Sequence, residues 1–413
     1  MPTKAKTRAG WTRVTFGDVV RQVRDIVDPE EDGLERYVAG EHMDTDDLRL
    51  RRWGTVGDGY LGPAFHMRFK PGHVLYGSRR TYLRKVAVAD FEGVTANTTF
   101  VLESMDPSKL LPELLPFVMQ TESFHEHSIK QSKGSVNPYV NFSDLTWYEF
   151  ALPPLDEQRR IIDVLAASSN ALEAARNLGA TTAQLIRGLL DSVMFSGSEA
   201  HLGDVPSVPG TWKVIPAEGL SVELVTKGAT PTSELRETDT GTPFIKVYNL
   251  TFDGVLDFSV EPTYVTRQGH EANRRSRIQA GDVLMNIVGP PLGKLALVPQ
   301  GFPEANINQA IVRYRCATGD YARWLLFYLR SGVAQRWLFG RSKKTSGQRN
   351  LTLAMCRELP VPVPPPEEMA TLLRRLTEIN ERQEKIRKRV ASIASVRDAL
   401  LSSALSEGCI AKH

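Results

Sequence analysis

The chain has 413 residues, of which 41% are hydrophobic and 24% are charged, and its formal net charge is +3. This length is too great for one hydrophobic core and predicts roughly two to four domains, and the composition excludes a largely disordered chain. The charge is too small to indicate a nucleic-acid partner by itself, and no apolar run long enough to cross a bilayer or to form a signal peptide is present, so we expect a cytoplasmic protein with no membrane partner.

The first predicted domain is a mixed α/β unit over residues 11–151, which follows a flexible tail of residues 1–10. We call this domain the first head. Short apolar segments predict strands at residues 11–16, 36–39, 71–76 and 85–88, and residues 109–121 predict a helix that Pro116 could break. A polar loop rich in turn-forming residues follows at residues 130–138.

The next predicted element is a long helix over residues 152–197. Pro153 and Pro154 prevent a helical continuation upstream. Asp156 is a suitable N-cap, and Glu157 adds negative charge where the helix dipole favours it. Apolar or small residues then recur every seven residues, which predicts a coiled-coil seam. The two interleaved series are Ile161, Ser168, Ala175, Thr182 and Leu189, and Leu165, Leu172, Gly179, Ile186 and Val193.

The chain then repeats this plan. A linker at residues 198–209 leads to a second head at residues 210–362, a second long helix at residues 363–408 and a tail at residues 409–413. Residues 281–284, 292–296 and 305–306 match residues 72–75, 83–87 and 96–97 at one offset of 209, and the polar loop and the helix start repeat at an offset of 211. Several matches at nearly one offset predict a tandem duplication.

The two long helices carry matching apolar stripes. In the second helix the seam residues are Leu372, Ile379, Ile386, Ile393 and Leu400, with Leu376 and Val390 on the second row. Helices with one apolar stripe each can bury those stripes against each other. We therefore expect an antiparallel coiled coil, roughly 60 Å long, with the two heads related by an approximate two-fold axis.

Two similar but non-identical heads on a rod can bind two separated, non-identical targets. Sites on one face of DNA recur every ~34 Å, which suits such a rod. Basic residues with interleaved aromatic and amide side chains gather at matching places in both heads. The candidate DNA-binding residues are Arg79, Arg80, Tyr82, Lys85, Lys130, Lys133, Ser135 and Asn137 in the first head, and Lys294, Arg341, Lys343, Lys344, Ser346, Gln348 and Arg349 in the second. Asn97 and Asn306 sit just inside strand-like segments, where a structural bond to the backbone is expected.

Catalytic and metal-binding interpretations find little support. Residues 289–294 resemble a phosphate-binding loop, but they are one residue short and contain two prolines, which lack N–H groups. Residues 137–139 only partly match the catalytic motif of amino-methyltransferases. His125 and His127 have no evident third ligand, so we expect both on a surface helix, and Cys316, Cys356 and Cys409 show no paired spacing. The sequence favours a non-catalytic binding protein with no catalytic or metal-binding residues.

The junctions before the long helices carry a family resemblance. Residues 152–161, Leu-Pro-Pro-Leu-Asp-Glu-Gln-Arg-Arg-Ile, residues 361–368, Val-Pro-Val-Pro-Pro-Pro-Glu-Glu, and residues 346–351, Ser-Gly-Gln-Arg-Asn-Leu, resemble the specificity (S) subunit of type I restriction-modification systems. The resemblance covers almost the whole chain after residue 10. Met369 stands where this family usually has glutamine, which weakens any role for Gln158 beyond helix capping.

The resemblance implies that each head is a target-recognition domain for one half of an asymmetric bipartite site on double-stranded DNA. It implies two methyltransferase subunits as partners, which use S-adenosylmethionine to methylate adenine, and two restriction subunits with ATP and Mg²⁺ in systems that include them. The S subunit itself would bind no cofactor and catalyse nothing, and its long helices would act as a ruler between half-sites. The alternatives are a two-headed DNA-binding scaffold or regulator of another defence system, and an unrecognised methyltransferase or nuclease.

Overall fold

The computed structural model describes residues 8–135, 137–194, 208–231, 235–236, 241–289, 291–345 and 348–405. The chain divides into two compact units, Met1–Arg176 with Arg389–His413, and Asn177–Lys388. Each unit contains one head together with part of each long helix, α5 (Leu155–Met194) and α10 (Pro366–Leu405). The expected class, mixed α/β with two heads and two long helices, is confirmed. None of the helices in the described ranges is long and apolar enough to cross a membrane.

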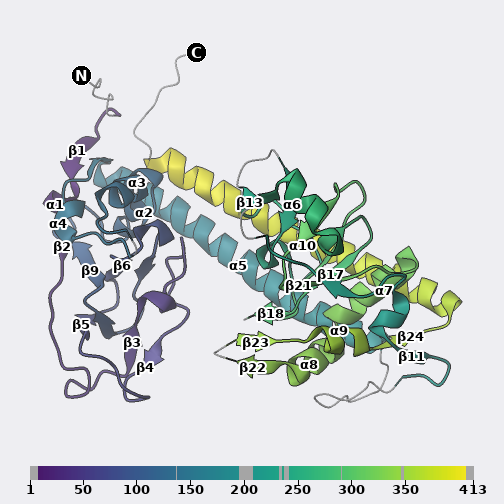
Figure 1. The fold of residues 1–413 in the computed structure, drawn as a ribbon. Helices are drawn as coiled ribbons and strands as arrows, with labels where there is room; N and C mark the ends of the chain where they lie inside the picture. Colours follow the sequence, from purple (N-terminus) through teal and green to yellow (C-terminus); the bar gives the residue numbers. More distant parts are fainter. Residues whose placement is uncertain are drawn as a thin grey trace. The chain divides into compact units, whose positions relative to one another are not determined.

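The first head consists of two small sheets and a two-stranded ribbon (Figure 1). One sheet is antiparallel, in the order β2 (Val20–Gln22), β9 (Thr99–Ser104), β6 (Val74–Gly77) and β7 (Val86–Val88). The other has the order β4 (Gly54–Thr55), β3 (Arg36–Val38), β8 (Gly93–Ala96) and β5 (Phe65–Phe69), with β3 and β8 parallel. The ribbon pairs β1 (Thr12–Thr15) with β10 (Glu149–Leu152), so the strand that begins the head meets the strand that ends it.

Short helices complete the first head: α1 (Phe16–Val19), α2 (Leu115–Met119), α3 (Glu122–Gln131), α4 (Phe142–Leu145) and the 3₁₀ turns η1 (Gly40–His42) and η2 (Thr81–Leu83). The four predicted strands are confirmed as β1, β3, β6 and β7. The helix predicted at residues 109–121 is wrong in extent, because only α2 forms there. Pro116 lies in the first turn of α2, where its missing N–H costs nothing, so it helps to start the helix and does not break it.

The second head repeats this topology. Its antiparallel sheet has the order β12 (Thr226–Lys227), β21 (Ile311–Tyr314), β17 (Val283–Asn286) and β19 (Leu295–Leu297), strand for strand the order of the first head. The second sheet has the order β13 (Leu235–Arg236), β15 (Tyr264–Val265), β14 (Thr242–Ile245), β20 (Ala305–Ile307) and β16 (Arg277–Ile278), with β14 and β20 parallel as β3 and β8 are. The predicted duplication is therefore confirmed in the topology of the two heads.

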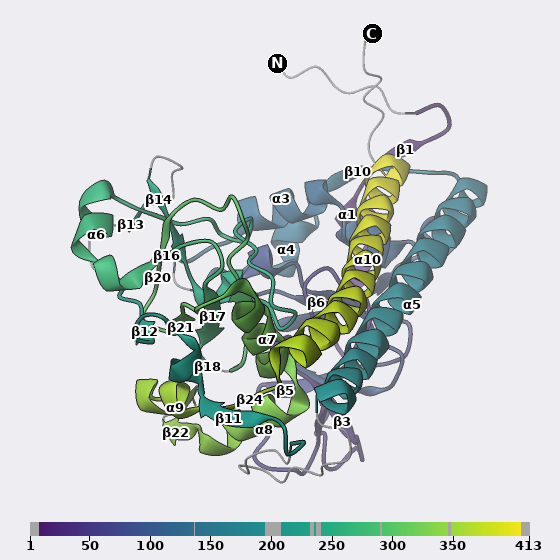
Figure 2. The ribbon, with the colours of Figure 1, turned by 90° about the vertical axis from the view of Figure 1, so that its right-hand side faces the viewer.

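The ribbon and the helices recur as well. Figure 2 shows β11 (Lys213–Pro216) beside β24 (Pro360–Val363), the counterpart of β1 with β10. The helices are α6 (Arg267–Ala272), α7 (Gly319–Arg330), α8 (Gly332–Arg341) and α9 (Leu353–Glu358), with the 3₁₀ turns η3 (Ala217–Leu220), η4 (Val247–Asn249) and η5 (Arg274–Ser276). The second head also has a three-stranded sheet in the order β18 (Val288–Gly289), β23 (Gln348–Asn350) and β22 (Lys343–Thr345). Among the described residues, the first head has no three-stranded sheet.

The apolar stripes of the long helices join the cores of the heads. In the first unit, Ile161 and Leu165 of α5 share a core cluster with Leu401 of α10. In the second unit, Ile186 of α5 shares a cluster with Leu372, Leu376 and other residues near the start of α10. The start of one helix thus contacts the same core as the end of the other, as an antiparallel pair requires. The continuous coiled coil remains a prediction.

Two details of the helix prediction are wrong. The helix α5 begins at Leu155, so Asp156 lies within the first turn and does not cap it. Leu189, predicted in the seam, is 47% exposed, while Leu190 is buried. A straight helix drifts by about 20° per heptad against a strict seven-residue repeat, so the buried position moves on by one residue after four heptads. The same shift makes Leu401 buried, while Leu400 is only half-buried.

Polar contacts tie each head to the helix segments of its own unit. Arg397 of α10 donates to Gln120 Oε1 in the first head. In the second head, Arg330 donates to Asn380 Oδ1 at 2.6 Å and to Gln383 Oε1 at 2.8 Å, both on α10. Because buried guanidinium groups need partners, these bonds specify one packing of helix against head.

Candidate nucleic-acid interface

The two loops that carry the first-head candidates lie against each other. The N–H of Arg80 donates to the carbonyl of Pro138 at 2.6 Å, and the N–H of Val140 donates to the carbonyl of Ser78 at 2.9 Å. Arg79 and Tyr139 form an isolated antiparallel bridge between the same segments. Residues 78–84 and 132–140, which are some fifty residues apart in sequence, therefore form one surface.

The candidate side chains of the first head differ in their partners. Lys85 donates to the carbonyl of Gly40 and is therefore part of the internal packing. Lys133 contacts both carboxylate oxygens of Asp144, at 3.1 and 2.9 Å, and this hydrogen bond holds the pKa of Asp144 below its ordinary value. Arg80 donates from Nε and Nη2 to Asn137 Oδ1, at 3.0 and 2.8 Å. The remaining candidates are exposed: Arg79, Tyr82, Lys130 and Ser135.

A cleft of about 610 Å³ opens beside this surface. It is lined by Gln22, Arg24, Ser78, Arg79, Asn97, Thr98, Phe100, Tyr139, Val140, Asn141, Phe142, Ser143 and Thr146. Its lining includes two arginines and several amides and hydroxyls but no carboxylate, a composition suited to phosphates and base edges. Of these residues, Gln22, Arg24, Tyr139 and Asn141 were missed from the sequence. Only the strand pairing of β2, β6 and β9 brings their segments together.

Asn97 and Asn306, equivalent in sequence, differ in environment. Asn306 is 1% exposed; its Oδ1 accepts from His270 Nδ1 at 2.6 Å, and its Nδ2 donates to Ser276 Oγ at 2.7 Å. Asn97 is exposed and lines the cleft. The structural role expected for both therefore fits Asn306, and Asn97 instead joins the polar residues of the cleft.

In the second head, the matching segments form the sheet β18–β23–β22. Val288 pairs with Asn350, as Arg79 pairs with Tyr139 in the first head, and Lys343 also pairs with Asn350. Asn286, fully buried, braces the turn that follows β17: its Nδ2 donates to the carbonyl of Pro291 at 2.8 Å, and its Oδ1 accepts from the N–H of Lys294 at 2.8 Å.

The basic candidates in this sheet and at the end of α8 differ in the contacts of their side chains. The guanidinium of Arg349 lies 3.8 Å from the ring centroid of Phe339 and contacts Ser342 Oγ at 3.2 Å, while that of Arg341 lies 5.1 Å from the ring of Trp337. Arg341 and Lys343 are exposed. For Lys344 and Gln348 the structure describes the backbone, in β22 and β23, and Ser346 lies outside the described residues.

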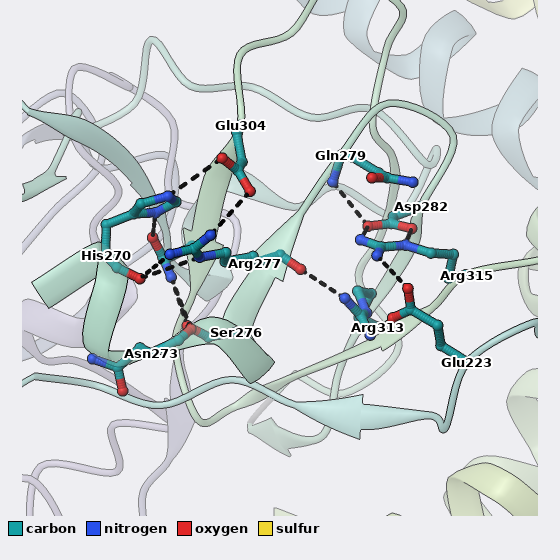
Figure 3. Close-up of polar contacts among 11 residues, drawn as sticks. Glu223, His270, Asn273, Ser276, Arg277, Gln279, Asp282, Glu304, Arg313 and Arg315 are labelled. Carbon is teal, nitrogen blue, oxygen red and sulfur yellow. Dashed lines mark hydrogen bonds and ion pairs between the residues drawn. The ribbon is translucent and has the colours of Figure 1, made fainter. Parts of the chain in front are cut away.

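Other arginines of the second head belong to an internal network (Figure 3). Arg315 donates to both oxygens of Asp282, each at 2.8 Å, and to Glu223 at 2.8 Å, and Arg313 donates to the other oxygen of Glu223. The bond from Arg315 is the main reason that the pKa of Glu223 lies below its ordinary value. Arg277 lies 3.8 Å from Glu304. These arginines stabilise the fold, and their charge is largely neutralised.

The residues considered for catalysis are placed as follows. His125, expected at a surface, is 1% exposed and lies 3.6 Å from Asp46, because α3 turns this side of its helix into the head. His127 Nε2 lies 2.9 Å from the carbonyl of Asp144. Asn137 is engaged by Arg80. Among the described residues, no group of three or more histidine, cysteine, aspartate or glutamate side chains is arranged to hold a metal ion.

The fold and surface define a class of protein: two heads of one topology, each with basic and amide side chains on matched loops, and each packed on long helices. Residues 54–180 match the family model described as the type I restriction modification DNA specificity domain. The chain is therefore similar to the specificity subunits of type I restriction-modification systems, and the resemblance predicted from the junctions is confirmed.

Individual relatives agree with this assignment. The MjaVIII specificity subunit of Methanocaldococcus jannaschii is 20% identical over 324 residues, which cover 76% of this chain and 74% of that subunit. The EcoDI specificity subunit of Escherichia coli is 24% identical over 152 residues, 37% of this chain, and the match spans only 33% of the length of that subunit.

Solved structures share the fold. The S subunit of a type I system from M. genitalium has a TM-score of 0.51 at 15% identity, with 99% of this chain and 100% of that chain covered. A chain from a study of complex assembly and conformational transition in a type I restriction-modification system has a TM-score of 0.53 at 18% identity, with 97% and 98% covered. At these identities the likeness supports the fold alone.

Proposed function

We propose that this chain is the specificity subunit of a type I restriction-modification complex and that it reads an asymmetric bipartite sequence on double-stranded DNA, one half with each head. The main support for this proposal is that the two heads share one strand topology but carry different side chains on their matched loops. The strand orders of the two heads match, yet the matched loops carry Arg79, Arg80 and Asn137 in one head and a lysine-containing hairpin in the other. Two heads with the same fold and different side chains on their matched loops suit two different half-sites.

The same proposal assigns the partners. Two methyltransferase subunits would dock on the chain and methylate one adenine per half-site with S-adenosylmethionine, and two restriction subunits with ATP and Mg²⁺ would join where the system includes them. This chain would bind none of these cofactors and would act without a catalytic residue of its own. The names of the relatives, specificity subunits of type I restriction enzymes, support this division of labour.

The test is a single-molecule methylome of the source strain with and without the gene. We expect deletion to abolish adenine methylation at one bipartite motif and to leave every other methylated motif intact. Restoring the gene on a plasmid should restore that motif. If no motif changes while the methyltransferase partner is expressed, the proposal is wrong, and binding of DNA and of S-adenosylmethionine by the purified chain would then distinguish a scaffold from an enzyme.

A further inference from the structure

The turn at residues 78–84 of the first head holds its outward side chains on a fixed base. Thr81 is 2% exposed and shares a hydrogen bond of 2.7 Å with Ser132 across the two loops. The N–H of Arg80 is bound by Pro138, and its carbonyl accepts from the N–H of Leu83 at 2.8 Å. A side chain projected from such an anchored turn loses less freedom on binding than one on a loose loop.

The backbone conformation of this turn does not explain why arginine occupies positions 80 and 84. Arg80 and Arg84, with φ of 51° and 49°, both lie in the left-handed region, which is unfavourable for residues with a Cβ atom. The residue 209 positions after Arg84 is Gly293, with φ of 87°, whereas the counterpart of Arg80, Gly289, lies in strand β18 and outside the left-handed region. Glycine would therefore satisfy the turn, so the reason for arginine lies in its side chain.

The two arginines have different partners. Arg84 donates to both carboxylate oxygens of Glu122, at 2.7 and 2.6 Å, so its side chain has a structural role. Arg80 is exposed and shares one neutral oxygen, Asn137 Oδ1, between its Nε and Nη2. Within the described ranges, no ion pair engages Arg79 or Arg80. The donor edge of Arg80 is thus oriented, and its two donors share a single acceptor.

That edge has a specific complement on DNA. The two parallel donors of a guanidinium match the O6 and N7 acceptors of guanine in the major groove. On guanine each donor would have its own acceptor, in place of the one oxygen that both share in the protein. The equivalent turn of the second head offers Pro291 and Leu292, which have no side-chain donors, before the next cation at Lys294. The two heads therefore present different chemistry at the same place in the fold.

We propose that Arg80 is a specificity-determining residue that reads a guanine in the half-site of the first head, and that the turn of the second head makes no such contact. This inference rests on the proposed function and adds the base and the residue that recognises it.

The experiment compares methylomes of strains that express the full chain with its own methyltransferase partner, as wild type, R80G, R80K and R21A. The R80G variant removes the guanidinium and leaves a residue that favours the observed φ, so the turn should keep its conformation. We expect R80G to methylate sites with any base at one guanine position of one half-site, with discrimination there reduced about ten- to a hundredfold and the other half-site unchanged.

The other variants separate base reading from phosphate binding. R80K keeps the charge but loses the paired donors, so it should also lose discrimination at that position. R21A removes an exposed arginine paired with Glu103 and should leave the motif and the extent of methylation unchanged. Melting curves of the purified variants show whether they are folded. If R80G is unstable, the comparison of R80K with the wild type is sufficient for the test.

Several results would overturn the inference while the proposed function stands: a bipartite motif without guanine in either half-site, full discrimination by R80K, or a uniform loss of methylation in R80G with the motif unchanged. The last result would make Arg80 a phosphate contact. If the wild-type chain directs no bipartite methylation at all, the proposed function fails and the inference fails with it.

Discussion

At the scale of single residues, the structure separates arginines that stabilise the fold from cations that remain available to a partner. Arg315 and Arg313 are bound to Asp282 and Glu223, and Arg84 is bound to Glu122. Arg79 and Lys343, by contrast, are exposed on the surfaces formed by the matched loops. A basic run in the sequence is therefore a weak indicator of binding until its neighbouring carboxylates are known.

The lysine pair of the second head tests the loop assignment. Replacing Lys343 and Lys344 together with alanine should weaken DNA binding at all sequences and should lower the magnitude of the salt slope by about 2, because each phosphate contact releases roughly one counterion. Affinity measured over a salt titration gives both quantities. The matched control is Lys213→Ala, an exposed lysine of β11. Unchanged affinity and salt slope in the double variant would show that the loop assignment is wrong.

The ion-pair network of the second head predicts a pH dependence of stability. The pKa of Glu223 lies below its ordinary value of 4.5, mainly through its hydrogen bond from Arg315. A carboxylate with a depressed folded-state pKa contributes stability above its unfolded pKa, and that contribution is lost as pH falls through the folded value. We expect the unfolding temperature of the wild type to fall more steeply than that of Glu223→Gln as pH decreases below about 4.5. Parallel curves for the two proteins would contradict this.

At the scale of elements, the two junctions that start the long helices use different chemistry at one position. Gln158, fully buried, accepts from the N–H of Leu111 at 2.9 Å and donates to the carbonyls of Lys109 and Pro153 at 2.7 and 2.9 Å. Its role is to join the first turn of α5 to the loop before α2, beyond the capping role expected from the sequence. Met369, its counterpart, packs in the apolar core of the second head.

These environments predict that the two residues cannot be exchanged. Gln158→Met should leave the N–H of Leu111 and the carbonyls of Lys109 and Pro153 without their side-chain partner, and should lower the free energy of unfolding by about 2–4 kcal/mol. Met369→Gln should bury an unpaired amide at a similar cost. Thermal melting of each variant measures the effect, with Arg159→Met, an exposed neighbour on α5, as the control. A melting temperature within a degree or so of wild type for either variant would contradict this account.

At the scale of the whole molecule, the duplication provides two heads and two helices that share one plan. If α5 and α10 set the distance between the half-sites, as the family resemblance implies, then their length determines the spacer and the heads determine the bases. Inserting seven residues into each helix, after residues 176 and 388, preserves the heptad register and adds about 10 Å, equal to about 3 base pairs. We expect a methylated motif with a spacer longer by about 3 base pairs and unchanged half-sites.

One further variant completes that experiment. A four-residue insertion in one helix alone shifts its seam against the partner and should reduce methylation, because apolar positions then face polar ones. A motif whose half-sites change while its spacer stays constant would show that the helices do not act as the ruler.

Much of the fold could be predicted because its signals are local or repeated. The prolines and acidic residues at the junctions predicted the starts of α5 and α10 to within a few residues, and the common offset of 209 predicted the duplicated heads. The candidate site was predicted less completely. The sequence indicated the loops with Arg80 and Asn137, but it gave no sign that Lys85 binds the carbonyl of Gly40 or that Gln22 lines the cleft.

The sequence by itself determined the duplication, the long amphipathic helices and the resemblance to a family, because periodicity, helix-start chemistry and repeated segments are properties of neighbouring residues or of their order. Only the tertiary structure decided which charges are neutralised and which loops form one surface. Glu223 meets Arg315 across 92 residues, and Arg80 meets Asn137 across 57. Such contacts depend on strand pairing between distant segments, which forms only when the whole head packs around its core.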